Sequence, residues 1–274
     1  MLLIVWNSEG DRWDALWNHW VSKEVQRAQD TLLGLVIEAG WAPWVPKYAA
    51  GGAVADVRVN TEYALSSDYY DYATPPLSAF CQGMLGRPGK RTRTGRSALW
   101  IPWVKTFDAL NVNARCSMGS LFCPLGSDRI PAPHWKARRI EGNIRPALEA
   151  SLQVGGDVQT VVFLVHLASS ARALTELNTL TDQITRLIPE DAQALVVGDM
   201  NVNILGLHNP KLNLGPHWSI ARTCQPTQRA GGELDYALVY DRSRSMRVKA
   251  STLCRFDLHP NESDHSVMQY EISL

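Results

Sequence analysis

Short apolar runs that stop at an acid or a histidine constrain the fold of this chain most. Runs of this length are typical of strands buried on both faces, not of helices. Polar side chains therefore gather where strands of a packed sheet end, and such ends converge on a cleft. Four of these runs lie in the second half of the chain: 161–165 before His166, 194–197 before Asp199, 234–240 around Asp235, and 267–272 after Asp264 and His265.

The first half of the chain adds two more runs of the same kind. Residues 2–6 and 32–37 read as buried strands that end at Asn7 and Glu38. Between residues 13 and 29 the apolar side chains follow helical spacing, and residues 171–188 show the same spacing up to Pro189. Alternating or apolar runs return at 111–122 and 146–152, whereas the pattern is weak over 45–102. Strands and helices are therefore both expected, as in an α/β or α+β protein.

Charge and cysteine content exclude several classes of protein. The 274 residues carry 27 basic and 27 acidic side chains, so the chain cannot hold nucleic acid by its net charge. A local basic groove could still bind phosphates. Its candidates are residues 87–96 and the cluster Lys136, Arg138 and Arg139, which are otherwise a solvated surface. The five cysteines form no C-x-x-C pair, which argues against a zinc knuckle or a thioredoxin-type site. We expect no transmembrane segment and see no signal peptide.

The polar residues at the strand ends suit phosphate chemistry. Carboxylates that lie close together raise one another's pKa or bind a cation, and hard oxygen ligands favour Mg²⁺ or Mn²⁺. A neutral histidine beside a carboxylate is the usual proton acceptor near pH 7. Each piece also has a plain structural interpretation: Asp199-Met200-Asn201 as a turn, Ser263-Asp264-His265 as a helix cap or turn, and His166 as a core or rim histidine. The ordered series favours the catalytic interpretation.

That series resembles the endonuclease/exonuclease/phosphatase superfamily, and within it the catalytic subunit of cytolethal distending toxins. The superfamily likeness rests on Trp6-Asn7, the segment 35–40 with Glu38, the segment 163–166, Gly198-Asp199-Met200-Asn201, Leu234-Asp235-Tyr236 and Ser263-Asp264-His265. The likeness to the toxin subunit rests on the segments 145–148, 165–169 and 226–236, and more loosely on 111–114. The chain departs from the usual pattern at Ile37, where glutamine is common, and at Met200, where phenylalanine is.

The resemblance implies one domain over residues 1–274 with a DNase I-like fold. This fold is a four-layered α/β sandwich, in which two mixed β-sheets pack face to face with helices outside. The resemblance also implies a Mg²⁺-dependent (or Mn²⁺-dependent) endonuclease that hydrolyses DNA phosphodiesters as the genotoxic, virulence-associated subunit of a toxin. Such a subunit has delivery or binding subunits as partners, is secreted as a mature protein, and acts in the host nucleus.

The family's roles carry over residue by residue. His166 and His265 are the acid/base pair, with Asp235 orienting His166 and Asp264 orienting His265. Asp199 and Asn201 position the water and the phosphate. The resemblance implies that Glu38 holds the metal with Asn7, and that Asp264 is a further ligand. Arg145 and Arg115 neutralise the phosphate as negative charge develops.

Two other functions fit the same residues. Relatives with this site hydrolyse phosphoinositides, so a phosphatidylinositol 3,4,5-trisphosphate phosphatase, or another phosphodiesterase of this fold, is the alternative. Its lipid-facing loop would be the tryptophan-rich segments 41–44 and 100–103, which otherwise pack in the core or at a subunit contact. A scaffold without catalysis is the third hypothesis, and it predicts decay of a site that here keeps every core residue type.

Overall fold

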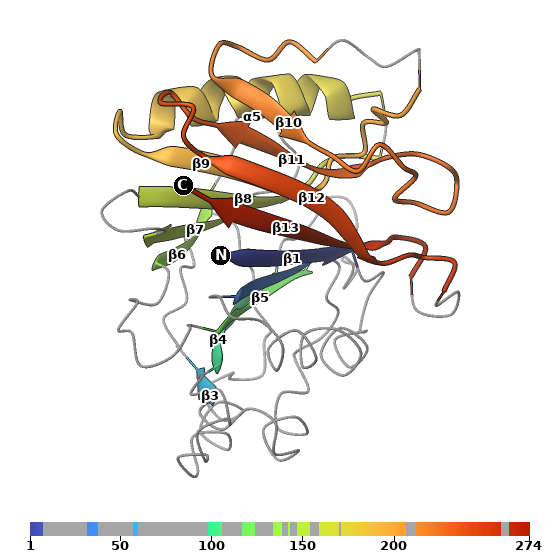
Figure 1. Ribbon diagram of the computed structural model, residues 1–274, viewed down its shortest axis with the longest axis horizontal. Coiled ribbons are helices and arrows are strands. Elements are labelled where there is room, and N and C mark those ends of the chain that lie inside the picture. Colours follow the sequence, from blue (N-terminus) through green and yellow to red (C-terminus); the bar gives the residue numbers. More distant parts are fainter. Residues whose placement is uncertain are drawn as a thin grey trace.

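Strands dominate the computed structural model of the chain (Figure 1). The structure describes residues 1–7, 32–37, 57–59, 98–105, 117–123, 134–138, 142, 147–153, 159–169, 171–206, 212–258 and 263–274. Within these residues the strands form two sheets of seven and six strands. Both sheets are mixed, because each contains parallel as well as antiparallel neighbours.

The seven-stranded sheet joins the two ends of the sequence. Strand β1 (Leu2–Asn7) lies between β13 (Val267–Ser273), to which it is antiparallel, and β2 (Leu32–Ile37), to which it is parallel. Its order is β12-β13-β1-β2-β5-β4-β3, where the remaining strands are β12 (Arg247–Cys254), β5 (Ser117–Cys123), β4 (Ala98–Lys105) and β3 (Val57–Val59).

The six-stranded sheet is built around one parallel pair. Strand β8 (Gln159–His166) runs parallel to β9 (Gln193–Asp199), so the carboxyl ends of both strands reach the same edge. The order of this sheet is β10-β11-β9-β8-β7-β6, with β10 (Trp218–Ala221), β11 (Asp235–Tyr240), β7 (Ala147–Gln153) and β6 (His134–Arg138).

The main hydrophobic core lies between the two sheets. Leu3 and Leu35 of the seven-stranded sheet belong to the same buried cluster as Leu164 and Leu195 of the six-stranded sheet. Successive side chains of a strand point to opposite faces, so the residues between these face away from this core. Because the inner strands are apolar on both faces, they read in the sequence as continuous apolar runs.

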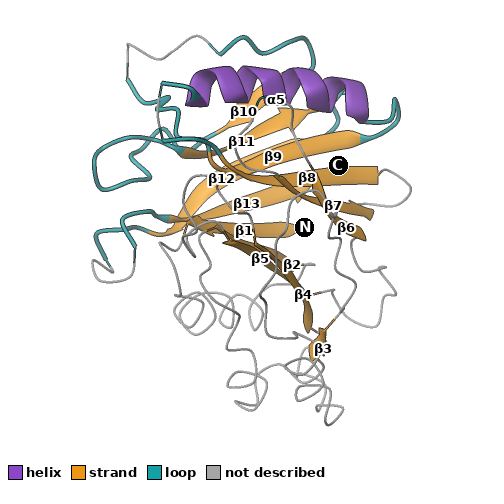
Figure 2. Ribbon diagram, turned by 180° about the vertical axis from the view of Figure 1, so that it is seen from behind, coloured by secondary structure: helices purple, strands orange, loops and turns teal. Residues whose placement is uncertain are grey.

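Helix α5 (Ala173–Leu187) covers the outer face of the six-stranded sheet (Figures 1 and 2). Its apolar stripe, with Leu177, Leu180 and Ile184, packs into a second cluster with Phe163 of β8 and Val196 of β9. The helix follows the predicted range 171–188 closely and stops just before Pro189, as expected from the missing N–H of proline.

The predicted fold class is confirmed: two mixed sheets pack face to face, with a helix on an outer face. The predicted helix over 13–29 lies outside the described residues, as does most of the segment 45–102. None of the described helices combines the length and the apolar character that a bilayer crossing requires.

Candidate active site

Five polar residues meet where the strands of the two sheets end. Asn7 ends β1, His166 ends β8, Asp199 ends β9, Asp235 begins β11, and His265 lies two residues before β13. All five are buried. The pairing of strands explains their convergence, since Asp199 lies opposite His166 on one neighbouring strand and opposite Asp235 on the other.

A glycine lets the two parallel strands approach closely at this edge. Gly198 has a φ of 129°, and a Cβ atom added to it would lie 2.1 Å from the carbonyl oxygen of Val165. Only glycine adopts this backbone without strain, and only glycine leaves room for the carbonyl group. Gly198 therefore sets the distance between the ends of β8 and β9, and with it the placement of His166 beside Asp199.

The turn after β9 fixes the Asp199 carboxylate. The backbone N–H of Asn201 donates to Oδ1 of Asp199 at 2.9 Å, and the Asn201 side-chain Nδ2 donates to the carbonyl of Leu167, also at 2.9 Å. Asn201 has a φ of 49°, a left-handed conformation that asparagine tolerates better than most residues. The turn therefore ties Oδ1 to the backbone, and Oδ2 carries the contacts across the site.

Oδ2 of Asp199 contacts side chains from both sheets. Asn7 of the seven-stranded sheet donates its Nδ2–H to this oxygen at 3.1 Å. The Nε2 atom of His166 lies 3.6 Å from it, and the Nε2 atom of His265 lies 3.7 Å from it. One carboxylate oxygen is thus shared by two imidazole rings.

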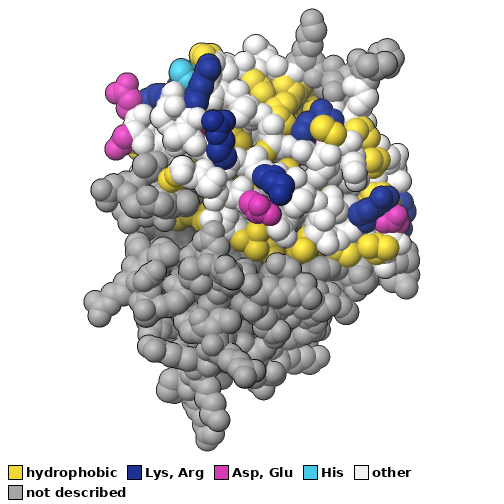
Figure 3. All heavy atoms as spheres, viewed as in Figure 1, with side chains coloured by type: hydrophobic (Ala, Val, Ile, Leu, Met, Phe, Trp, Pro, Cys, Tyr) yellow, Lys and Arg dark blue, Asp and Glu magenta, His cyan; other side chains and the backbone are white. Residues whose placement is uncertain are grey.

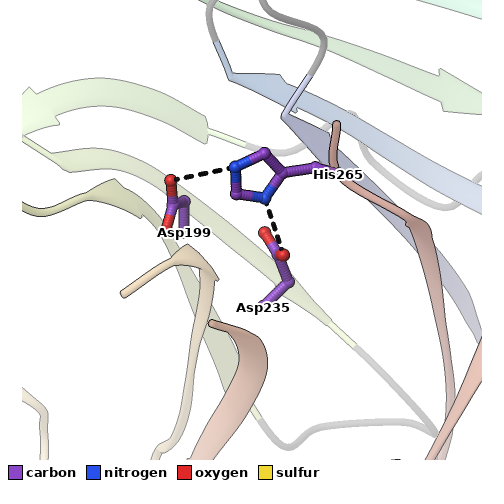
Figure 4. Close-up of side chains that lie close together, drawn as sticks. All are labelled: Asp199, Asp235 and His265. Atoms are coloured by element: carbon purple, nitrogen blue, oxygen red, sulfur yellow. Dashed lines mark hydrogen bonds and ion pairs between the residues drawn. The ribbon is translucent and has the colours of Figure 1, made fainter. Parts of the chain in front are cut away.

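The His265 ring lies between two carboxylates, one at each nitrogen (Figure 4). Its Nδ1 lies 2.8 Å from Oδ2 of Asp235, and because a carboxylate only accepts, Nδ1–H donates to it. Its Nε2 faces Asp199 and lies 3.5 Å from Oδ1 of Asp264. The Nδ1–H bond to Asp235 fixes the orientation of the ring and directs Nε2 into the site.

The expected pairing of the acids with the histidines needs correction. The resemblance implied that Asp235 orients His166, but Asp235 bonds Nδ1 of His265. The strand order explains the difference: β9 lies between β11 and β8, so Asp235 and His166 stand on opposite sides of Asp199. Asp264, which was expected to orient His265, lies at its Nε2, and the orienting bond at Nδ1 comes from Asp235.

Burial and charge shift the pKa values of the central residues. Burial raises the pKa of the Asp199 carboxyl to about 6; the charge of His265 opposes the rise and the charge of Asp235 adds to it. Burial by itself lowers the pKa of His265, but the charge and hydrogen bond of Asp235, with the charges of Asp199 and Asp264, raise it to about 10. Before any ligand binds, the His265 ring is therefore positively charged at neutral pH, with a proton on each nitrogen.

Three residues that received no role from the sequence support this arrangement. Ser263 donates its Oγ–H to the carbonyl of Asn7 at 2.7 Å and accepts the backbone N–H of His265 at 3.0 Å. The indole N–H of Trp6 donates to the carbonyl of His265 at 3.4 Å. Gln228 donates from Nε2 to Oδ2 of Asp264 at 3.1 Å. All three lie within the motifs quoted for the resemblance, which was the available signal.

The donor set fits a divalent cation. Asp199, Asp235 and His265 each offer a ligand atom, and these atoms lie within 4.8 Å of one another. The two carboxylates offer hard oxygen ligands, whereas the imidazole can bind a metal only in its neutral form. The raised pKa of the Asp199 carboxyl points the same way, because a cation stabilises a buried anion that has a second anion beside it. Of the expected ligands, Asn7 and Asp264 lie at this site.

Several predicted phosphate and metal contacts fall on other parts of the chain. Glu38, Arg115 and Arg145 lie outside the described residues, as do Arg139 and the segment 87–96. On the face shown in Figure 3, the described basic side chains are dispersed, several of them beside acids. Among the described residues, Lys249 lies 3.9 Å from Glu271 and Arg255 lies 3.0 Å from Asp257. The phosphate-binding role of Arg115 and Arg145 stays a prediction.

Solved structures of several enzymes and toxins share this fold. The structure of CdtB, titled the biologically active subunit of cytolethal distending toxin, matches with a TM-score of 0.56 and 15% identity, over 98% of this chain and 96% of that chain. The cytolethal distending toxin from Actinobacillus actinomycetemcomitans matches with a TM-score of 0.56 and 18% identity, over 98% and 97%. D. rerio TDP2 complexed with single strand DNA product matches with 0.55 and 13%, over 100% and 99%.

An endonuclease/exonuclease/phosphatase family protein from Leptotrichia buccalis C-1013-b also matches, with a TM-score of 0.54 and 11% identity, over 100% of both chains. No family model matches the chain, and no curated protein sequence does either. At identities this low, the structural matches show a common fold and nothing more. The chain therefore resembles the endonuclease/exonuclease/phosphatase proteins in its fold, as its motifs predicted.

Proposed function

We propose that this chain is a metal-dependent phosphodiesterase that cleaves DNA. The observation that carries the proposal is the approach of two histidines to one buried carboxylate, with Nε2 atoms 3.6 and 3.7 Å from Oδ2 of Asp199. Two histidines can divide the work of general acid and general base. The proposed activity belongs to one domain over residues 1–274.

The proposed reaction is hydrolysis by in-line attack of water on phosphorus. One histidine takes a proton from the water, a P–O bond forms, and the opposite P–O bond breaks as the other histidine protonates the leaving oxygen. His265 suits the acid role, because its raised pKa of about 10 keeps Nε2 protonated. His166 would then be the base. Asp235 keeps the His265 ring oriented, and Asn201 holds the Asp199 turn.

A divalent cation, Mg²⁺ or Mn²⁺, would supply positive charge that stabilises the phosphorane-like transition state. Asp199 is the described carboxylate that would hold it, together with Asn7, Asp264 and Glu38 from the family scheme, whereas His265, protonated at both nitrogens, serves as the acid. Arg145 and Arg115 would add charge at the phosphate, where a planar guanidinium binds two oxygens at once.

The toxin role is part of the same proposal. The segment 226–236 and the other motifs quoted above resemble the catalytic subunit of cytolethal distending toxins, and two of the structures that share the fold come from such toxins. We infer a secreted toxin subunit that is carried by delivery or binding subunits and damages DNA in the host nucleus. Phosphatidylinositol 3,4,5-trisphosphate, the alternative substrate, is tested beside DNA.

The first test is nicking of supercoiled plasmid by the purified protein. We expect nicking with Mg²⁺ that EDTA abolishes, and a loss of at least about 100-fold in His166→Ala and His265→Ala, since an acid or base contributes about 10²–10⁴-fold. Release of phosphate from phosphatidylinositol 3,4,5-trisphosphate is measured in parallel. Phosphate release without nicking would move the assignment to the lipid phosphatase, and a folded protein inactive in both assays would contradict the catalytic proposal.

A further inference from the structure

Thr227 lies between the two segments that carry the Asp235–His265 pair. Its side chain is fully buried. It belongs to the segment 222–234, which connects β10 to β11 and therefore ends where Asp235 begins. The neighbouring segment 263–266 carries His265 into β13. Thr227 contacts both.

The side chain of Thr227 holds the start of β11. Its Oγ1 accepts the backbone N–H of Leu234 at 2.9 Å and that of Asp235 at 3.0 Å. A hydroxyl oxygen has two lone pairs, so one threonine can satisfy both donors. A buried N–H left without an acceptor costs about 1–3 kcal/mol, so the two bonds fix the backbone at the residue that bears the carboxylate.

The backbone of the same residue holds the His265 segment. The Thr227 carbonyl accepts the N–H of Ser266 at 2.7 Å, and the N–H of Arg229 donates to the Asp264 carbonyl at 2.9 Å. Gln228 and His265 form an antiparallel bridge between these bonds. The segment is closed on itself as well, because the N–H groups of Thr227 and Gln228 both donate to the Gly232 carbonyl.

We propose that Thr227 is a positioning residue that sets the 2.8 Å contact between Asp235 and His265. The proposal rests on the proposed function, because the pair it positions is the proposed catalytic one. One residue ties the backbone of Asp235 through its side chain and the backbone beside His265 through its carbonyl. The side-chain part of this link is removable without changing the shape of the core, because valine has nearly the shape of threonine.

The test compares Thr227→Val, which removes the acceptor, with Thr227→Ser, which keeps it. The matched control is Thr160→Val: Thr160 is also fully buried, but its Oγ1 has no hydrogen-bond partner within the described part of the chain. The primary readout is the NMR resonance of the His265 Nδ1–H in the metal-free protein, assigned by its loss in His265→Gln. A bonded Nδ1–H is protected from exchange with water, so this resonance reports the pair without substrate or metal.

We expect Thr227→Val to shift or broaden this resonance, and to lower kcat for DNA cleavage by about 10- to 100-fold with KM nearly unchanged, as expected when a reacting group is misplaced. Thr227→Ser restores both, and Thr160→Val leaves both as in the wild type. If Thr227→Val does not fold, Thr227→Cys, which has only a weak acceptor, is expected to shift the resonance.

A wild-type resonance and wild-type kcat in a folded Thr227→Val or Thr227→Cys would overturn the proposal, even if the melting temperature fell. Absence of the resonance in the wild-type protein would overturn it as well. If the wild-type protein cleaves no DNA while the resonance responds as expected, the proposed function has failed and the positioning role of Thr227 has not.

Discussion

Two carboxylates, one at each ring nitrogen, control the protonation of His265. Asp235 lies at Nδ1 and Asp199 at Nε2, and together they hold the pKa of this histidine at about 10, well above its ordinary value of 6.5. The folded protein therefore keeps a proton on His265 over a range of pH in which the unfolded chain has lost it. Linkage turns this difference into a dependence of stability on pH.

The sign of this dependence follows from the direction of the shift. Below pH 6.5 both states hold the proton and the contribution of His265 to stability is fully present; it is lost as pH rises towards 10. We expect the free energy of unfolding of the metal-free protein to fall between pH 7 and 9, by up to about 1.4 kcal/mol per pH unit. Urea unfolding in EDTA at several pH values measures it.

Asp235→Asn should flatten this slope, because the neutral amide removes the largest charge that raises the pKa of His265. Asp257→Asn is the matched control, since Asp257 is exposed and pairs with Arg255 on the surface. Equal slopes in wild type and Asp235→Asn would show that the pair does not control the protonation of this ring.

At the scale of elements, the approach of β8 to β9 depends on Gly198. An alanine there combines a disfavoured φ of 129° with a methyl group 2.1 Å from the Val165 carbonyl oxygen. We expect Gly198→Ala to destabilise the protein by about 2–6 kcal/mol, since backbone strain and overpacking each cost about 1–3 kcal/mol. His166 and Asp199 would shift with the strands, and DNA cleavage would fall.

Gly231→Ala separates the two causes. Gly231 also has a positive φ, of 95°, but nothing lies within 4 Å of an added methyl group. The free energy of unfolding of this variant should fall only by the cost of the backbone strain, about 1 kcal/mol. Urea unfolding of both variants measures the difference, and equal losses would show that the close approach to Val165 has no energetic weight.

Most of the inner strands could be predicted from the sequence, whereas the edge strands and the inner strand β4, which begins where the sequence pattern is weak, could not. Residues 2–6, 32–37, 161–165, 194–197, 234–240 and 267–272 were expected as strands and lie in β1, β2, β8, β9, β11 and β13. Strands β12, β3, β10 and β6, which were not expected, are the four sheet edges. An inner strand is apolar on both faces, but an edge strand such as β12 has mostly exposed or half-buried residues and therefore no apolar run.

The site was predictable in its residues but not in its pairs. Asn7, His166, Asp199, Asp235 and His265 converge as their places at strand ends indicated. Which acid bonds which histidine depends on the order of β11, β9 and β8 within the sheet, and this order arises from contacts distant in sequence. A motif that names two acids and two histidines contains no information about that order.

At the scale of the whole molecule, the site joins the two sheets. Asn7 and His265 come from the seven-stranded sheet and its approach to β13, whereas His166, Asp199 and Asp235 come from the six-stranded sheet. A cation held by Asp199 and Asn7 would therefore cross-link the two layers.

We expect Mg²⁺ or Mn²⁺ to raise the melting temperature relative to EDTA, because a ligand bound only by the folded state stabilises it, by about 2.7 kcal/mol at about 100 times its Kd. Calorimetry of wild type and Asp199→Asn tests this. The variant should lose the response to the cation, while Asp257→Asn should keep it. A wild-type melting temperature that does not respond to either cation would contradict a metal site at Asp199.

The place of β13 between β1 and β12 also has a consequence in time. A ribosome makes β1 early, but the neighbour that completes its pairing, and His265 beside that neighbour, emerge more than 250 residues later. Figure 1 shows β1 and β13 side by side. Since pairing between distant segments must wait for the later one, a growing chain has no assembled site before His265 and the strand beside it have left the ribosome.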